Sequence, residues 1–154
     1  SGGPAGAALL GSVQTQSSAV WPSDDGRYLY STYEALSCNN GEQGHLQVVD
    51  LLNPSAPVVV RTITPQSLGL GNSSSFLPQA VGDKLYVTFT GAGLQVFSIL
   101  NRADPVRTHQ FDTTLGTYVS ACVGDSVREA DGSEGPGRVI VSADRTGLLI
   151  LDVR

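Results

Sequence analysis

The stretch that decides the fold is GLQVFSILNRADPV, at residues 93–106. A copy of it, GHLQVVDLLNPSAPV, occupies residues 44–58, with His45 as one extra residue after the glycine. Three pairs of matching residues lie 48 positions apart: Leu46 and Leu94, Asn53 and Asn101, and Pro57 and Pro105. A third copy, GLLILDV, begins at residue 147. A period near 50 residues that consists of strands throughout is typical of propeller blades.

Each repeat divides into four strands that are rich in β-branched and aromatic residues and are separated by Gly, Asn, Asp and Pro. The expected first strands are 17–21, 74–77 and 118–123, and the second strands are 27–32, 84–88 and 138–142. The third strands lie in the three copies quoted above, and the fourth strands are 58–63 and 106–111. Alternation along the third strands predicts burial between neighbouring blades of Leu46, Val48, Leu94, Val96, Leu148 and Ile150.

The segment 7–15 resembles a fourth strand without a blade of its own, which gives an expected total of twelve strands. We therefore expect an all-β fold with one domain, 1–154, of three four-stranded propeller blades, in repeats near 16–63, 73–111 and 117–154. The opening strand would be displaced to complete the last blade, as in ring closure. Because propellers need at least about four blades, another chain must complete the ring. A head-to-tail homodimer would do so, and the alternative is a complementary fragment of a longer propeller.

Composition narrows the classes of function. The chain has 154 residues, with 9 Lys and Arg against 14 Asp and Glu, so its net charge of −5 disfavours nucleic acid as a partner. No apolar run approaches the roughly 18 residues of a membrane span. A single lysine, abundant small polar residues and two cysteines favour a secreted, periplasmic or cell-surface location.

Residues 93–106 and 44–58 resemble the LVIVD repeat, although Ser98 stands where that repeat usually has Asp. The stretch 21–30, WPSDDGRYLY, is similar to the turn and strand of YVTN and lactonase-type propellers. Both resemblances imply a β-propeller. The LVIVD resemblance also implies a surface or exported protein, and it implies no particular chemistry.

One loop is longer than its counterparts and carries the candidate site. The connection from the second to the third strand takes 17 residues from Leu29 to Leu46, but 9 from Leu85 to Leu94. In propellers this connection and the one between blades share the face where ligands bind. The polar residues placed there are Glu34, Asn39, Asn40, Glu42 and His45. The alternative is a loop insertion without a function, which loops tolerate at little cost.

Metal and cofactor chemistry has weaker support. Asp24-Asp25-Gly26 is expected to be a tight turn. The acidic loop 124–137 is a calcium candidate by composition, but it lacks the ligand order of a calcium loop, so we expect a solvated mobile loop and no cofactor. Cys38 and Cys122 form either one disulfide or two free thiols. A zinc site at Cys38 and His45 lacks the usual ligand spacing.

Two hypotheses follow. The first is a non-enzymatic exported propeller module that presents loops to a protein or glycan partner. The second is a propeller enzyme of the lactonase or lyase type, with His45 and carboxylates at the channel mouth and with or without a metal. His109 lies on an outer strand and is a poor candidate for catalysis.

Overall fold

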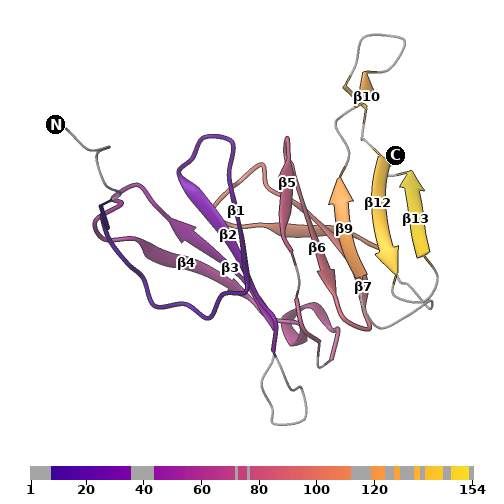
Figure 1. Ribbon diagram of the computed structural model, residues 1–154, viewed down its shortest axis with the longest axis horizontal. Helices are drawn as coiled ribbons and strands as arrows, with labels where there is room; N and C mark the ends of the chain where they lie inside the picture. The colour runs from indigo at the N-terminus through magenta and orange to yellow at the C-terminus, as the bar shows by residue number, and fades with distance from the viewer. Residues whose placement is uncertain are drawn as a thin grey trace, which may run out of the picture.

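The computed structural model shows an all-β protein of sheets stacked side by side (Figure 1). It describes residues 8–35, 44–71, 73–75 and 77–111, together with the backbone of five strands between 119 and 152.

The first sheet is a four-stranded antiparallel meander in the order β1-β2-β3-β4. Its strands are β1 (Ala19–Pro22), β2 (Tyr28–Tyr33), β3 (His45–Asp50) and β4 (Val58–Ile63). The turn between β3 and β4 forms as the Asn-Pro pattern predicts, because the Asn53 side chain accepts a hydrogen bond from Ser55 N at 3.1 Å and Pro57 precedes the last strand.

The second sheet repeats the first in the order β5-β6-β7-β8. Its strands are β5 (Gln79–Val81), β6 (Lys84–Phe89), β7 (Gly93–Ser98) and β8 (Val106–Phe111). The 3-10 helix η2 (Gln66–Leu68) lies in the connection between the two sheets. The pairing of the last two strands is shifted between Val48 and Val49 in the first sheet and between Val96 and Phe97 in the second. Because these positions are 48 residues apart, the repeat extends to the β-bulge itself.

The third sheet has three described strands in the order β9-β12-β13, namely β9 (Val119–Val123), β12 (Arg138–Ala143) and β13 (Gly147–Asp152). They match the predicted first, second and third strands of the last repeat. Between β9 and β12, where a mobile loop was expected, β10 (Val127–Arg128) and β11 (Glu134–Gly135) pair as a short antiparallel hairpin. Backbone pairing therefore organises part of this polar segment, and its expected mobility and exposure stay a prediction.

The main core lies between the first and second sheets, and the two sheets contribute opposite faces to it. Tyr30 and Val48 are cross-strand partners in the first sheet, and both belong to this core. Their counterparts in the repeat, Tyr86 and Val96, are also partners and buried, but they are not part of it. The second sheet instead contributes the alternate residues Leu85, Val87, Phe89 and Phe97. One face of the first sheet therefore packs on the opposite face of the second.

The third sheet lies against the second. Strand β9 contacts β5, β6 and β7, and the face of Tyr86 and Val96 is buried although it is turned away from the first sheet. The predicted burial of Leu46, Val48, Leu94 and Val96 is confirmed, since all four are fully buried. The side chains of Leu148 and Ile150 lie outside the described residues.

The structure confirms an all-β fold with two four-stranded antiparallel sheets. The predicted three four-stranded propeller blades are not shown: among the described residues no sheet closes, and the third sheet has three strands. Two predicted strands differ from the structure. Residues 8–17, which include most of the expected opening strand 7–15, form no strand. In the segment 74–77, Ser75 makes a single bridge to Phe89, and regular pairing begins only at Gln79, after Pro78, whose missing N–H interrupts a ladder.

Candidate functional site

The long loop of the candidate site leaves the sheet between Tyr33 and His45. These two residues face each other across the strand pair, with ring centroids 5.3 Å apart and ring planes inclined by 35°. Glu34 continues from β2, and its backbone N–H donates a hydrogen bond to Ser18 Oγ at 2.9 Å. The structure therefore places Glu34 and His45 at the same end of the hairpin. The other predicted site residues, Asn39, Asn40 and Glu42, lie outside the described residues.

A buried run of three serines, residues 73–75, holds this end of the hairpin, and we call it the serine clasp. Ser74 Oγ donates to the carbonyl of Ala35 at 2.9 Å, and Ser75 Oγ lies 2.8 Å from the carbonyl of His45 and 3.0 Å from that of Tyr33. The clasp belongs to the connection between the two sheets. That connection and the hairpin loop therefore share one end of the stack, as propeller geometry predicts.

Gly44 shows how closely the serine clasp approaches the hairpin. A Cβ atom at this position would overlap the backbone nitrogen of Ser75 and lie 2.6 Å from Ser74 Cα. Its own N–H donates to the carbonyl of Ser73 at 3.0 Å. Only glycine fits at this position. These serines were not among the residues predicted for the site, although three consecutive serines at the start of the predicted strand 74–77 were the available signal.

His45 is the titratable side chain of this end that carries an unused polar atom. Its Nε2 is buried and has no hydrogen-bond partner among the described residues. An imidazole nitrogen of this kind can accept or donate a hydrogen bond to a ligand, and the neighbouring Tyr33 ring offers a surface for stacking. In the described part of the chain, no three His, Cys, Asp or Glu side chains meet in a group that could hold a metal.

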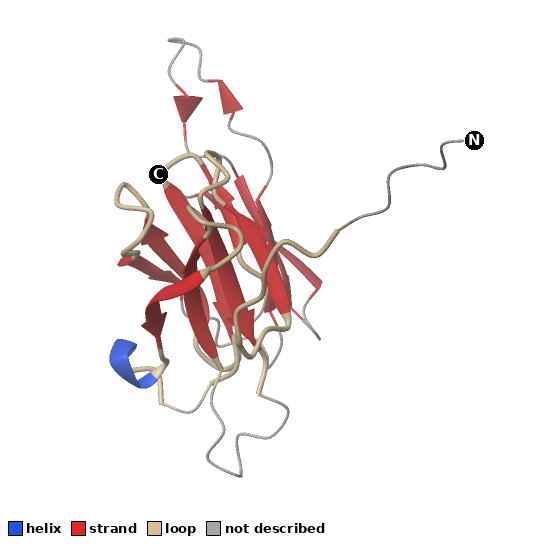
Figure 2. Cartoon of the chain, turned by 90° about the vertical axis from the view of Figure 1, so that its left-hand side faces the viewer, coloured by secondary structure: helices blue, strands red, loops and turns tan. Residues whose placement is uncertain are grey.

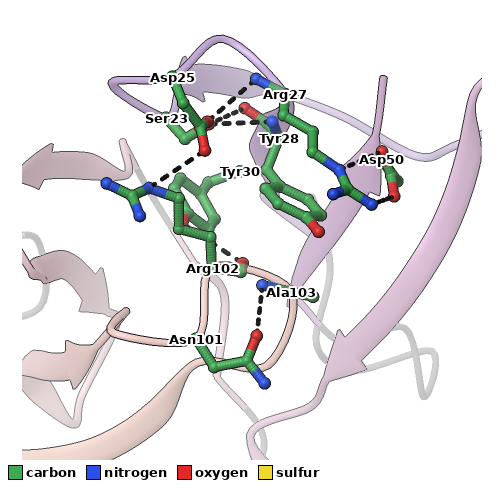
Figure 3. A network of polar contacts seen from close by, with 9 residues as sticks. All are labelled: Ser23, Asp25, Arg27, Tyr28, Tyr30, Asp50, Asn101, Arg102 and Ala103. Atoms are coloured by element: carbon green, nitrogen blue, oxygen red, sulfur yellow. Dashed lines mark hydrogen bonds and ion pairs between the residues drawn. The ribbon is translucent and has the colours of Figure 1, made fainter. Parts of the chain in front are cut away.

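A second polar cluster joins the first and second sheets at the other end of the stack (Figure 3). Asp25 lies in the tight turn that the sequence predicted, where Ser23 Oγ donates to its carboxylate at 2.6 Å and Gly26 has φ of 68°. Its Oδ2 forms an ion pair with Arg102 Nε at 3.6 Å across the sheet interface. Tyr30 Oη donates to the carbonyl of Arg102 at 3.4 Å.

Hydrogen bonding and burial shift several pKa values in this polar cluster. The hydroxyl of Ser23 lowers the pKa of Asp25, and Arg27 lowers that of Asp50 through a bidentate contact of 2.9 and 3.3 Å. Asp50 in turn raises the pKa of Arg27. Burial raises the pKa of Tyr30 to about 12. These shifts stabilise the charged carboxylates and the neutral phenol, which is the behaviour of a structural junction.

The structure places none of the remaining candidate residues at either end of the stack of sheets. His109 is exposed on β8, where its Nδ1 lies 3.1 Å from Thr108 Oγ1. Cys38 and the side chain of Cys122 lie outside the described residues, so their pairing stays open.

We compared the chain with family models, with curated proteins and with solved structures. None matched. The LVIVD resemblance therefore rests on the residues quoted above. No helix in the described residues is long and apolar enough to cross a membrane.

Proposed function

We propose that this chain is a non-enzymatic module of propeller-type blades, of the LVIVD kind, that belongs to an exported or cell-surface protein and acts by binding a protein or a glycan. The observation that carries the proposal is the packing of one face of a sheet on the opposite face of the next. Such a contact between unlike faces leaves two unlike faces at the ends of the stack and can propagate to a closed ring.

Ring closure is the second part of the proposal. A second copy of the chain would bring the number of blades to six, and a complementary propeller fragment is the alternative. In either case the unlike faces that remain at the two ends of the stack would pack together as the first and second sheets do.

The binding surface would lie at the end of the stack that holds Tyr33, Glu34 and His45. There the serine clasp bonds three carbonyls at the base of the hairpin, so this base is preorganised for binding. An aromatic ring beside an imidazole suits both glycan stacking and protein contacts. Calcium at the acidic loop 124–137 stays the alternative to a chain without a cofactor.

The test is a binding screen of the labelled protein against a glycan array and against surface proteins of its source cell. We expect the double variant Tyr33→Ala/His45→Ala to lose at least about tenfold in affinity for any ligand found. The control is Leu52→Ala, since Leu52 is 72% exposed in the turn at the opposite end of the first sheet. A ligand that responds to the control and not to the double variant would overturn this placement.

One specific observation supports a second candidate function: the Nε2 of His45 is buried and has no hydrogen-bond partner among the described residues. If the chain is an enzyme of the lactonase or lyase type, this nitrogen would exchange a proton with the substrate, and Glu34 would supply the carboxylate. The test is hydrolysis of a chromogenic lactone with and without added Ca²⁺ or Zn²⁺. A rate that His45→Ala abolishes would favour the enzyme, and no rate above that of His45→Ala would favour the binding module.

A further inference from the structure

The outer face of the first sheet is the side that points away from the second sheet. In the second sheet, the corresponding face packs on the first sheet. The outer face carries Leu29, Ser31 and Val49, the residues that alternate with the core-facing Tyr30 and Val48. In the repeat they match Leu85, Val87 and Phe97, which form the face of the second sheet that packs on the first. By this correspondence, the outer face is the one on which another sheet would pack. We call it the acceptor face.

Residues 8–17, which we call the strap, cover this outer face. Figure 2 shows the segment crossing the outer side of the first sheet. Ser17 Oγ bonds Ser31 Oγ at 2.9 Å, and Gly11 lies against Pro54 and Ser55 in the turn after β3. Although they point away from the second sheet, Ser31 and Val49 are 2% and 1% exposed.

The strap is extended but loosely held. Burial alternates from 11 to 16, with Gly11, Val13 and Thr15 half-buried and the residues between them exposed. This is the pattern of a strand that lies on a surface. Leu9 and Leu10 are 86% and 69% exposed, so two large apolar side chains have no place on the outer face. A segment with this pattern is suited to pair in a sheet.

The third sheet offers an edge strand, β13, with which the strap could pair. Among the described strands, β13 pairs with β12 alone, whereas its counterparts β3 and β7 also pair with β4 and β8. The sequence positions of β12 and β13 that match the core-facing residues of the first sheet are Ile140, Leu148 and Ile150. The third sheet thus repeats the sequence pattern of a sheet that packs on an acceptor face.

We propose that the strap exchanges between two positions: it covers the outer face of the first sheet in the single chain, and it adds to β13 of a second copy in the assembly. The exposed outer face then receives the third sheet of that copy. This inference rests on the assembly part of the proposed function. Assembly would give β13 a second neighbouring strand and cover the outer face with a whole sheet in place of the strap, so both changes favour the exchange.

Gly11 offers a substitution that releases the strap without removing it. A Cβ atom at this position would overlap the carbonyl oxygen of Pro54 and lie 2.9 Å from Ser55 Cα. Because these are backbone atoms, Gly11→Ala must displace the strap from the outer face, while alanine remains compatible with a strand. The matched control is Ser12→Ala, since Ser12 is exposed.

Sedimentation of the full chain at about 1 to 100 µM measures the self-association constant by mass action. We expect Gly11→Ala to lower the dissociation constant at least about tenfold relative to the unmodified chain and to Ser12→Ala. Deletion of residues 1–15 removes the added strand and is expected to weaken association instead. Release of the strap by Gly11→Ala is therefore expected to strengthen self-association, and removal of the strap is expected to weaken it.

The outcomes separate the two proposals. Association of the unmodified chain that Gly11→Ala leaves unchanged or weakens would overturn strap exchange and keep the assembly. Stronger association after the deletion would show that the strap only covers the outer face and does not add to β13 of the second copy. That result would also overturn the exchange. No association of any variant at the highest concentration would overturn the homodimer and the exchange together.

Discussion

Leu85→Ala tests whether the unlike faces of the first and second sheets form one cooperative core. Leu85 is fully buried, is the cross-strand partner of Phe97, and belongs to the cluster that joins the two sheets. Leu100→Ala is the matched control, because Leu100 is 78% exposed and the chemical change is the same.

The expected magnitude follows from what is removed. Three buried carbon atoms correspond to roughly 2.4 kcal/mol of transfer free energy. The neighbouring strands are held by their ladders and close the resulting cavity only in part, which brings the total loss to about 3 to 4 kcal/mol. For a chain of this size, such a loss lowers the Tm by roughly 6 to 16 °C. The control should change the free energy of unfolding by less than about 0.5 kcal/mol.

The assay is urea unfolding followed by circular dichroism and by the fluorescence of Trp21, the single tryptophan. Trp21 lies on β1 in the first sheet, whereas Leu85 lies on β6 in the second. In a cooperative stack, both signals shift together to lower urea with an unchanged slope. A Leu85→Ala variant as stable as Leu100→Ala, or a Trp21 transition that does not move, would refute the packing of the two sheets described here.

Four further outcomes are expected. Ser75→Ala removes the hydroxyl that serves two carbonyls of the hairpin and should cost about 1 to 2 kcal/mol in urea unfolding. Burial raises the pKa of Tyr30 to about 12 against an ordinary 10, so its contribution to stability is intact below pH 10 and is lost as the pH rises toward 12; Tyr30→Phe should flatten that part of the Tm profile. The pKa of Asp50 is lowered from 3.8, so its contribution is intact above that pH and is lost as the pH falls through the lowered value; Asp50→Asn should reduce this acid dependence. Deletion of residues 37–43 should leave the melting transition intact and weaken ligand binding, and loss of the fold would show that the segment is structural.

The strands were predictable from the sequence because strand patterns and turn residues act locally. The predicted bounds of the fourth strands, 58–63 and 106–111, agree with β4 and β8. The turns at Asn53 and Asn101 form the same side-chain contact, since Asn bonds the backbone two residues ahead wherever it occurs. Of the candidate site residues, Glu34 and His45 lie at the same end of the hairpin, and their role in binding stays a prediction.

Tertiary structure alone decided what covers each face. Val48 and Val49 are the same residue type in consecutive positions, and both are buried. Val48 packs in the core with the second sheet, whereas Val49, the next residue along the strand, faces the other way. Alternation along a strand separates the two faces of a sheet, but it carries no information about which distant segment covers either face. That is settled by contacts between residues far apart in the chain, such as Ser17 with Ser31 and the serine clasp with the hairpin.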